Sequence, residues 1–175
     1  MYNTTILKTP LSDEVIAGLT VGQMIYLSGT IYTARDAAHK RMVDMLRCGK
    51  EPFPFAGQVV FYAGPCPSPP GRVIGTIGPT TSGRMDIYTP DLIRHGLKVM
   101  IGKGPRNAEV VTAIRECGGI YFAAIGGAAA LMSRCVKSAE VIAFDDLGTE
   151  AIRCLAVERL SLIVAIDAHG NCAYS

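Results

Sequence analysis

The sequence is poor in aromatic residues and in net charge. It contains no tryptophan, 7% aromatic residues and a formal net charge of only +2 at pH 7 over 175 residues. Proteins that bind nucleic acid need a basic surface for the phosphates and often stack aromatic side chains on the bases. Nucleic acid is therefore not an expected partner. With 49% hydrophobic and 18% charged residues, the chain is predicted to fold around a sizeable core.

The cysteines lack any close spacing. No CxxC pair occurs among the six, which are Cys48, Cys66, Cys117, Cys135, Cys154 and Cys172. A chain of this length does not need disulfide bonds to hold a core, and its first residues lack the basic region and apolar run of a signal peptide. We therefore expect free thiols that lie in the core or have no role, no metal site in this chain, and a cytoplasmic location.

Long apolar runs and nucleotide-binding motifs are also missing. The longest apolar stretch, Gly118 to Met132, is interrupted by glycines and is shorter than the roughly 20 residues that span a bilayer. No membrane segment is expected. Gly102-Lys103-Gly104 follows an apolar run, but neither a GxxxxGK motif followed by Ser or Thr nor a GxGxxG motif occurs. A nucleotide site is therefore disfavoured.

Apolar runs and turn residues predict alternating strands and helices. Strands are expected at Thr4–Leu7, Met24–Ser28, Ile31–Thr33, Val59–Tyr62, Val73–Ile77, Val99–Ile101, Ile120–Ala124, Val141–Phe144, Ala151–Val157 and Leu162–Ile166. Helices are expected to begin at Ser12–Glu14 and Thr89–Asp91, and to occupy Ala34–Arg47, Asn107–Cys117 and Ala128–Arg134. The proline-rich segment Gly64–Gly71 should be a surface loop. Together these elements predict an α/β fold in one domain over residues 1–175, with a mixed sheet flanked by helices.

Three segments combine a cation or hydroxyl with a strand end or a helix start. They span residues 33–41, 78–86 and 102–107, and two of them also contain glycine, which lets a ligand approach the backbone. In α/β sheets ligands collect at strand ends, and the backbone N–H groups of a helix N-terminus favour anions. The shared chemistry of the three segments is anion capture.

Each of these residues also has an ordinary structural explanation. Arg35 taken alone is better explained by a surface salt bridge with Asp36. His39 lies one helical turn after Arg35 and would share its face, although a lone helical histidine is more often structural. Thr80 and Thr81 could simply cap a glycine turn, but the nearby Arg84 favours a site. The run Gly126 to Ala130 is best explained by close helix packing.

Read in order, the motifs resemble those of the class I fumarase and tartrate dehydratase family, in its β subunit or C-terminal domain. The shared motifs are Thr-Ala-Arg-Asp-Ala-Ala-His-Lys-Arg at 33–41, Gly-Pro-Thr-Thr-Ser-Gly-Arg-Met-Asp at 78–86, Lys-Gly-Pro-Arg-Asn at 103–107, Ile-Gly-Gly at 125–127, Asp-Leu-Gly-Thr-Glu-Ala at 146–151 and Ile-Asp-Ala-His-Gly-Asn at 166–171. They cover most of the chain.

The resemblance implies a swivelling β/β/α domain that closes over a separate α subunit or N-terminal domain. That partner would carry a [4Fe-4S] cluster on three cysteines, and the scattered thiols of this chain agree with its supplying none. The implied reaction is the reversible hydration of fumarate to L-malate, in an assembly such as α2β2.

The resemblance also implies roles for individual residues. Arg35, Arg84 and Lys103 would bind substrate carboxylates, arginine through two parallel contacts and lysine as a point charge. Thr80 would lie at the reacting carbon with Thr81 as a hydrogen-bonding neighbour. A threonine hydroxyl needs help to accept a proton at neutral pH, so His39 or a group on the partner is the alternative base.

Two other functions stay open at this point. Gly-Arg-Met-Asp followed by Lys-Gly-Pro-Arg-Asn looks more like the fumarases, which typically carry Lys-Gly-Asn-Arg-Ser, but Pro105 and Asn107 depart from that pattern. The chain could instead be the β subunit of L-tartrate dehydratase. A non-catalytic domain that binds dicarboxylates, or a structural subunit, is the alternative from another class.

Overall fold

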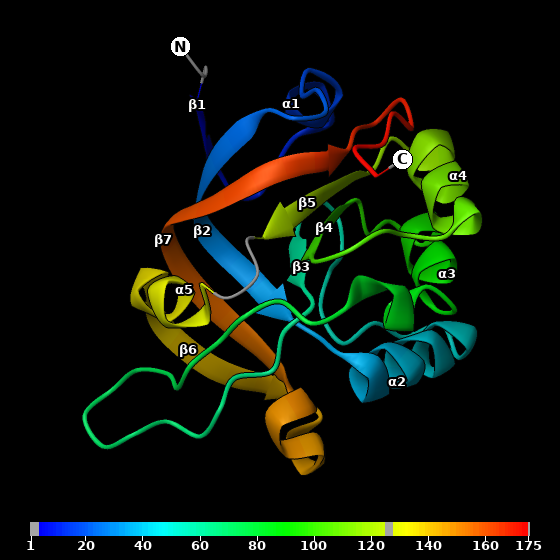
Figure 1. The fold of residues 1–175 in the computed structure, drawn as a ribbon. Coiled ribbons are helices and arrows are strands. Elements are labelled where there is room, and N and C mark those ends of the chain that lie inside the picture. Colours follow the sequence, from blue (N-terminus) through cyan, green and yellow to red (C-terminus); the bar gives the residue numbers. More distant parts are fainter. Residues whose placement is uncertain (1–3, 125–127, 175) are drawn as a thin grey trace.

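The computed structural model describes residues 4–124 and 128–174 as a mixed sheet with helices on both faces (Figure 1). Its strands are β1 (Thr4–Lys8), β2 (Met24–Thr33), β3 (Val59–Phe61), β4 (Val99–Gly102), β5 (Ile120–Ala124), β6 (Val136–Ala143) and β7 (Ile152–Ile166). Its helices are α1 (Asp13–Ala17), α2 (Asp36–Arg47), α3 (Thr89–Arg94), α4 (Ala108–Cys117) and α5 (Ala129–Cys135), with the 3-10 segments η1 (Ser82–Met85) and η2 (Asp145–Glu150). The predicted α/β class is confirmed.

Parallel pairing places several strand ends at one edge of the sheet. The strand order is β1-β2-β3-β4-β5-β7-β6, and β1 to β5 pair in parallel along this order. Strand β7 runs antiparallel to β5, β6 and β2. Because it pairs with both β5 and β2, the strands β2, β3, β4, β5 and β7 close into a barrel. The carboxyl ends of β2, β3, β4 and β5 therefore share one edge, where ligands of α/β proteins usually bind.

Strand β7 is continuous, whereas the sequence predicted two strands with a break before Leu162. Its pairing with β2 shifts register between Leu27 and Gly29. Opposite that shift, Arg159 has a positive φ of 54°, and its backbone N–H donates to Ser28 Oγ at 2.9 Å. A bulge of this kind bends a strand without ending it. The gap predicted between Val157 and Leu162 is therefore a bend within one strand.

Strands β3, β4 and β5 are buried on both faces, which explains their apolar runs. Val60, Met100 and Tyr121 face α2, α3 and α4, which lie side by side in Figure 1. Their neighbours along the strands point to the opposite core, beneath α1 and α5. Strands covered on both faces read as nearly continuous apolar runs rather than as alternating patterns.

Two other strand predictions need correction. Val73–Ile77 is not a strand: Ile74 and Ile77 are buried against the core, but β3 already has β2 and β4 as neighbours and offers no free edge. The strand predicted at Val141–Phe144 begins earlier, at Val136, and ends at Ala143, because Phe144 adopts a left-handed φ of 59°. The strands predicted separately at Met24–Ser28 and Ile31–Thr33 are one continuous strand, β2. The other predicted strands and helices are present within a few residues. The predicted Gly126-Gly127 packing contact lies outside the described residues.

None of the six thiols is fully buried, although Cys117 and Cys135 pack against the hydrophobic core. Cys48, Cys66 and Cys172 are exposed, and the other three cysteines are half-buried. Across the ranges 4–124 and 128–174, no group of three His, Cys, Asp or Glu side chains is close enough to hold a metal ion. No helix in those ranges is both long enough and apolar enough to cross a bilayer.

Candidate functional site

The segment from Pro79 to Ser82 lies across the carboxyl ends of β3 and β4. Pro79 pairs with Ala63 just after β3, and Thr81 pairs with Lys103 just after β4. The backbone N–H of Thr80 donates to the carbonyl of Tyr62 at 2.8 Å, and that of Ser82 donates to the carbonyl of Lys103 at 3.0 Å. These contacts bring together two segments that the sequence analysis selected separately.

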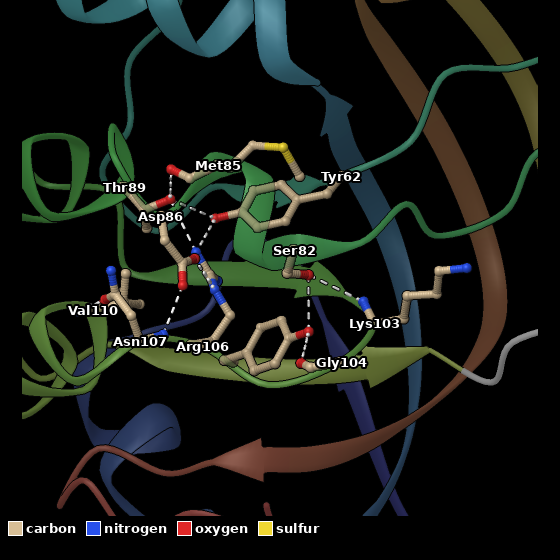
Figure 2. A network of polar contacts seen from close by, with 11 residues as sticks. Tyr62, Ser82, Met85, Asp86, Thr89, Lys103, Gly104, Arg106, Asn107 and Val110 are labelled. Atoms are coloured by element: carbon tan, nitrogen blue, oxygen red, sulfur yellow. Dashed lines mark hydrogen bonds and ion pairs between the residues drawn. The ribbon is translucent and has the colours of Figure 1, made fainter.

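Thr80 is held with its hydroxyl proton directed into the protein. Its Oγ1 donates to the Tyr62 carbonyl at 2.9 Å, and the residue is half-buried. The lone pairs of this oxygen remain available to accept a hydrogen bond from a ligand. Thr81 and Lys103 beside it are exposed, and Figure 2 shows the Lys103 side chain extending away from the polar network behind it.

Asp36 connects the two predicted arginines. Its carboxylate lies 3.5 Å from Arg35 Nη2 and 3.7 Å from Arg84 Nε. Asp36 Oδ2 and Arg35 Nε are buried and have no hydrogen-bond partner among the described residues. Arg35 is the more enclosed of the two arginines, with 22% of its side chain exposed against 50% for Arg84. The two cations therefore flank one carboxylate at the start of α2.

A distant segment completes the start of α2. Arg35 occupies the N-cap position of α2 but makes no side-chain capping bond. Glu150, at the end of η2, accepts from the backbone N–H of Ala37 at 2.8 Å and lies 3.5 Å from Arg35 Nη2. A β-carbon at Gly64 would lie 2.9 Å from Arg35 Cδ, so the glycine there leaves room for the arginine stem. The Arg35 side chain is thus placed by three separate parts of the chain.

His39 lies behind the site rather than on its surface. Its imidazole is fully buried, edge-on to the Tyr62 ring at 4.9 Å, with Nδ1 2.9 Å from the Arg35 carbonyl. Burial lowers the pKa of His39 to about 4, which keeps the ring neutral near pH 7. Because a carbonyl only accepts, Nδ1 carries the proton, and the buried Nε2 has no partner among the described residues.

The sequence analysis missed a buried cation beneath this surface. The Arg106 side chain is 0% exposed, and its Nε donates to Asp86 Oδ1 at 2.6 Å. Its Nη2 donates to Thr89 Oγ1 at 2.9 Å, and its guanidinium carbon lies 5.0 Å from the ring centres of both Tyr62 and Tyr121 (Figure 2). Burial opposes the charge, but Tyr62 and Asp86 outweigh it and raise the pKa of Arg106, so the guanidinium stays protonated.

A second chain of hydrogen bonds anchors Lys103. Ser82 Oγ accepts from the Lys103 backbone N–H at 3.1 Å and lies 2.9 Å from the Tyr121 hydroxyl. Tyr121 donates to the Gly104 carbonyl at 3.0 Å, so Ser82 must donate to Tyr121. Burial raises the pKa of Tyr121, so its hydroxyl keeps its proton. Asp86 and Arg106 stand inside the motifs at 78–86 and 103–107, but the contacts that unite them with both tyrosines are long-range.

The candidate residues lie on an open surface. Thr81, Arg84 and Lys103 are exposed, and Arg35 and Thr80 are half-buried. A separate hollow of 390 Å³ lies between the 65–75 loop and β6, and it is lined by none of these five residues. Most enzymes enclose their substrates more completely.

Comparison with known proteins gives consistent similarities. The family model described as fumarase C-terminus matches residues 3–175. The anaerobic class I fumarate hydratase of Escherichia coli is 38% identical over 90% of this chain but only 30% of its own length. The mitochondrial fumarate hydratase 1 of Leishmania major is 42% identical over 95% of this chain and 33% of its own length. This chain therefore spans about a third of the fumarate hydratases that it matches.

A relative of similar length to this chain is found in an archaeon. A protein of Methanocaldococcus jannaschii, provisionally named L(+)-tartrate dehydratase subunit beta, is 37% identical over 94% of this chain and 88% of its own length. The similarity thus extends both to about a third of long proteins and to most of a chain of similar length.

Proposed function

This chain belongs to the fumarase C-terminus family, and from that premise we propose that it is the substrate-binding half of a [4Fe-4S] hydro-lyase. The proposed reaction is the reversible hydration of fumarate to L-malate, carried out together with a cluster-bearing α subunit in an assembly such as α2β2. We also propose that residues 1–175 form one domain that swivels over the partner, and that the protein works in the cytoplasm.

The observation that supports the proposal is that Asp36 joins Arg35 to Arg84, while Thr81, next to Thr80, pairs with Lys103 at the edge where β4 ends. A dicarboxylate needs cations at both ends and further positive charge where its carbanion-like intermediate builds up. Arg35 and Arg84 lie on either side of Asp36, so a substrate carboxylate would compete with Asp36 for both guanidinium groups. Lys103 would then bind the other carboxylate as a point charge.

Thr80 is proposed as the group that meets the proton of the reacting carbon. The hydroxyl of Thr80 donates to the Tyr62 carbonyl, so in this geometry it can accept only a hydrogen bond. To take the proton of the substrate carbon it must first pass its own proton to a relay on the partner or in water, and cations near it would favour the deprotonated form. Thr81 would hold the substrate in place by a hydrogen bond. His39 is given a positioning role instead, because a buried neutral imidazole bound to the Arg35 carbonyl orients the residue that binds the carboxylate.

The residues of this chain do not fit a [4Fe-4S] cluster. Its six thiols lie on six separate elements or loops, and over the described ranges they form no ligand group. The cluster is therefore assigned to the partner, where it would supply a Lewis acid for the substrate hydroxyl. The part derived for this chain is binding the carboxylates and receiving a proton.

Tartrate is the second candidate substrate. It is favoured by the similarity to the archaeal protein named for a tartrate dehydratase subunit, which this chain matches over nearly its full length. The two substrates share two carboxylates and differ in their hydroxyl groups, so the same three cations would serve both.

The test is to produce this chain anaerobically with a cluster-bearing partner and to assay fumarate, L-malate and tartrate. We expect the two proteins together to turn over either fumarate and L-malate or tartrate, and neither protein alone to turn over any of the three. Anaerobic treatment of this chain alone with iron and sulfide should give neither a visible cluster absorption nor turnover. A stoichiometric cluster on this chain, or hydration without a partner, would refute the proposal.

A further inference from the structure

Arg106 follows Lys103 by three residues and would ordinarily be counted among the cations that bind substrate. We propose instead that Arg106 is a positioning residue: paired with Asp86, it fixes the segment that carries Thr80 and Arg84 relative to the segment that carries Lys103. This inference rests on the proposed function, because it assigns a role within that same site.

The burial of Arg106 excludes contact with a ligand at the surface. Its side chain is 0% exposed, and that of Asp86 is 7% exposed. Its Nε and Nη2 already contact Asp86, Thr89 and Tyr62, and its guanidinium lies between two tyrosine rings. Its Nη1 is buried as well and has no hydrogen-bond partner among the described residues. A cation held in this way cannot turn outward without leaving Asp86 buried and unpaired.

The Asp86–Arg106 pair joins the two functional segments directly. Asp86 directly follows η1, which contains Arg84, and its Oδ2 accepts from the backbone N–H of Asn107 at 2.6 Å. Asn107 in turn caps α4 by accepting from Val110 N at 2.9 Å. One carboxylate therefore holds both Arg106 and the start of α4, as Figure 2 shows.

Ser82 and Tyr121 form the second link between the segments. Ser82 exchanges two hydrogen bonds with the Lys103 backbone, at 3.0 and 3.1 Å, and its hydroxyl donates to Tyr121. Tyr121 also packs against the Arg106 guanidinium. Arg106 is thus the common neighbour of both links, and a loosened Arg106 would let Thr80 and Lys103 move relative to each other. A misplacement of about 1 Å in a catalytic arrangement can cost about a hundredfold in rate.

The test uses Arg106→Lys in the assembled enzyme, since lysine keeps the charge but cannot form the guanidinium fork. We expect kcat/KM to fall about tenfold to a hundredfold, and to fall much less when the same change is made in a Lys103→Met background. The matched control is Arg94→Lys, because Arg94 also joins two segments, by pairing with Glu109 at 3.8 Å, but is exposed. That control should stay within about twofold.

A second measurement does not depend on turnover. Residue-resolved hydrogen exchange in the assembled protein should show the Ser82 and Lys103 amides exchanging about tenfold faster in Arg106→Lys, with the β4 amides unchanged. Tyr121→Phe, which keeps the ring and removes only the hydroxyl, should accelerate the exchange of the same amides. It is the variant to measure if Arg106→Lys does not fold.

The outcomes separate the two proposals. The positioning role would be overturned by a normal kcat/KM in Arg106→Lys, or by unchanged protection of the Ser82 and Lys103 amides. It would also be overturned if Arg106→Lys lowered kcat/KM by the same factor in the Lys103→Met background as in the parent. If the unmutated assembly turns over none of the three substrates, the proposed function fails, while the exchange result still decides whether Arg106 holds the two segments together.

Discussion

Burial of His39 predicts a measurable loss of stability in acid. The pKa of this imidazole is lowered from 6.5 to about 4, chiefly by burial. Between those two values the unfolded chain binds a proton that the folded chain refuses, so the free energy of unfolding must fall as the pH drops. This is the behaviour of a base that is buried in its neutral form. His39 leaves the free energy of unfolding at its full value above about pH 6.5, and that free energy falls as the pH drops towards 4.

The size of the effect follows from the same two values. The pKa of His39 differs by about 2.5 between the unfolded and folded chain, and a pKa difference of one corresponds to about 1.36 kcal/mol. The full effect on the free energy of unfolding is therefore about 3 kcal/mol. About 2 kcal/mol of this should be lost between pH 7 and pH 5. His39→Asn, which keeps a donor close to the position of Nδ1, should be less stable at pH 7 because the ring is lost, but should lose less stability on acidification.

The assay is urea unfolding of the assembled protein and of the variant at several values between pH 7 and pH 4.5, with the slopes against pH compared. His95→Asn is the matched control, because His95 Nδ1 makes the same contact one turn back, 2.7 Å from the Asp91 carbonyl, on an exposed surface. Equal slopes for the parent and His39→Asn would refute the reasoning. They would also return His39 to consideration as a proton store near neutral pH.

Three kinetic predictions concern the site itself. Arg84→Ala should lower kcat/KM about tenfold to a hundredfold with the fold intact, as expected for one charge-assisted contact of about 1.5 to 3 kcal/mol, and near-normal kinetics would contradict it. Thr80→Val should slow proton exchange at the substrate carbon far more than it weakens binding, and an effect on binding alone would move the base elsewhere; Thr80→Ser is its control. Gly64→Ala should raise KM, because the new β-carbon would lie 2.8 Å from the Thr149 carbonyl oxygen and 2.9 Å from Arg35 Cδ and would displace η2 or Arg35; an unchanged KM would show that both adjust without moving the guanidinium.

Much of the fold and the surface of the site could be predicted from the sequence. Strands buried on both faces leave long apolar runs, and Asn107 and Gly118 mark the two ends of α4 by side-chain capping and a positive φ of 66°. These are local signals. Arg35 and Lys103 stand just after β2 and β4, so their meeting at one edge followed once these strands were parallel to β3. Thr80 and Arg84 follow no strand and reach that edge through the pairing of residues 79–82 with Ala63 and Lys103.

The rest depended on contacts that local patterns do not encode. The pattern around Ile74 and Ile77 predicted a strand, and both side chains do pack against the core. The neighbouring strand β3 is already paired on both edges, with β2 and β4, so this segment cannot join it. Arg106 reads as one more surface cation, and its partner Asp86 lies 20 residues away. His39 reads as facing the ligand because it follows Arg35 by one turn, but the Tyr62 ring, which comes from β3's end, encloses it.

The attachment of η2 to α2 bears on how the chain tolerates changes in length. Exposed turns are normally the places where insertions and deletions are accepted. Here Asp146 makes a two-pronged contact with Arg41, at 2.7 and 2.9 Å, and Glu150 supplies the missing cap of α2 beside Arg35. One residue added between Asp146 and Glu150 would shift these two anchors out of step. The length of this outer turn is therefore constrained by its contacts with Arg35 and Arg41, more than a hundred residues earlier in the chain.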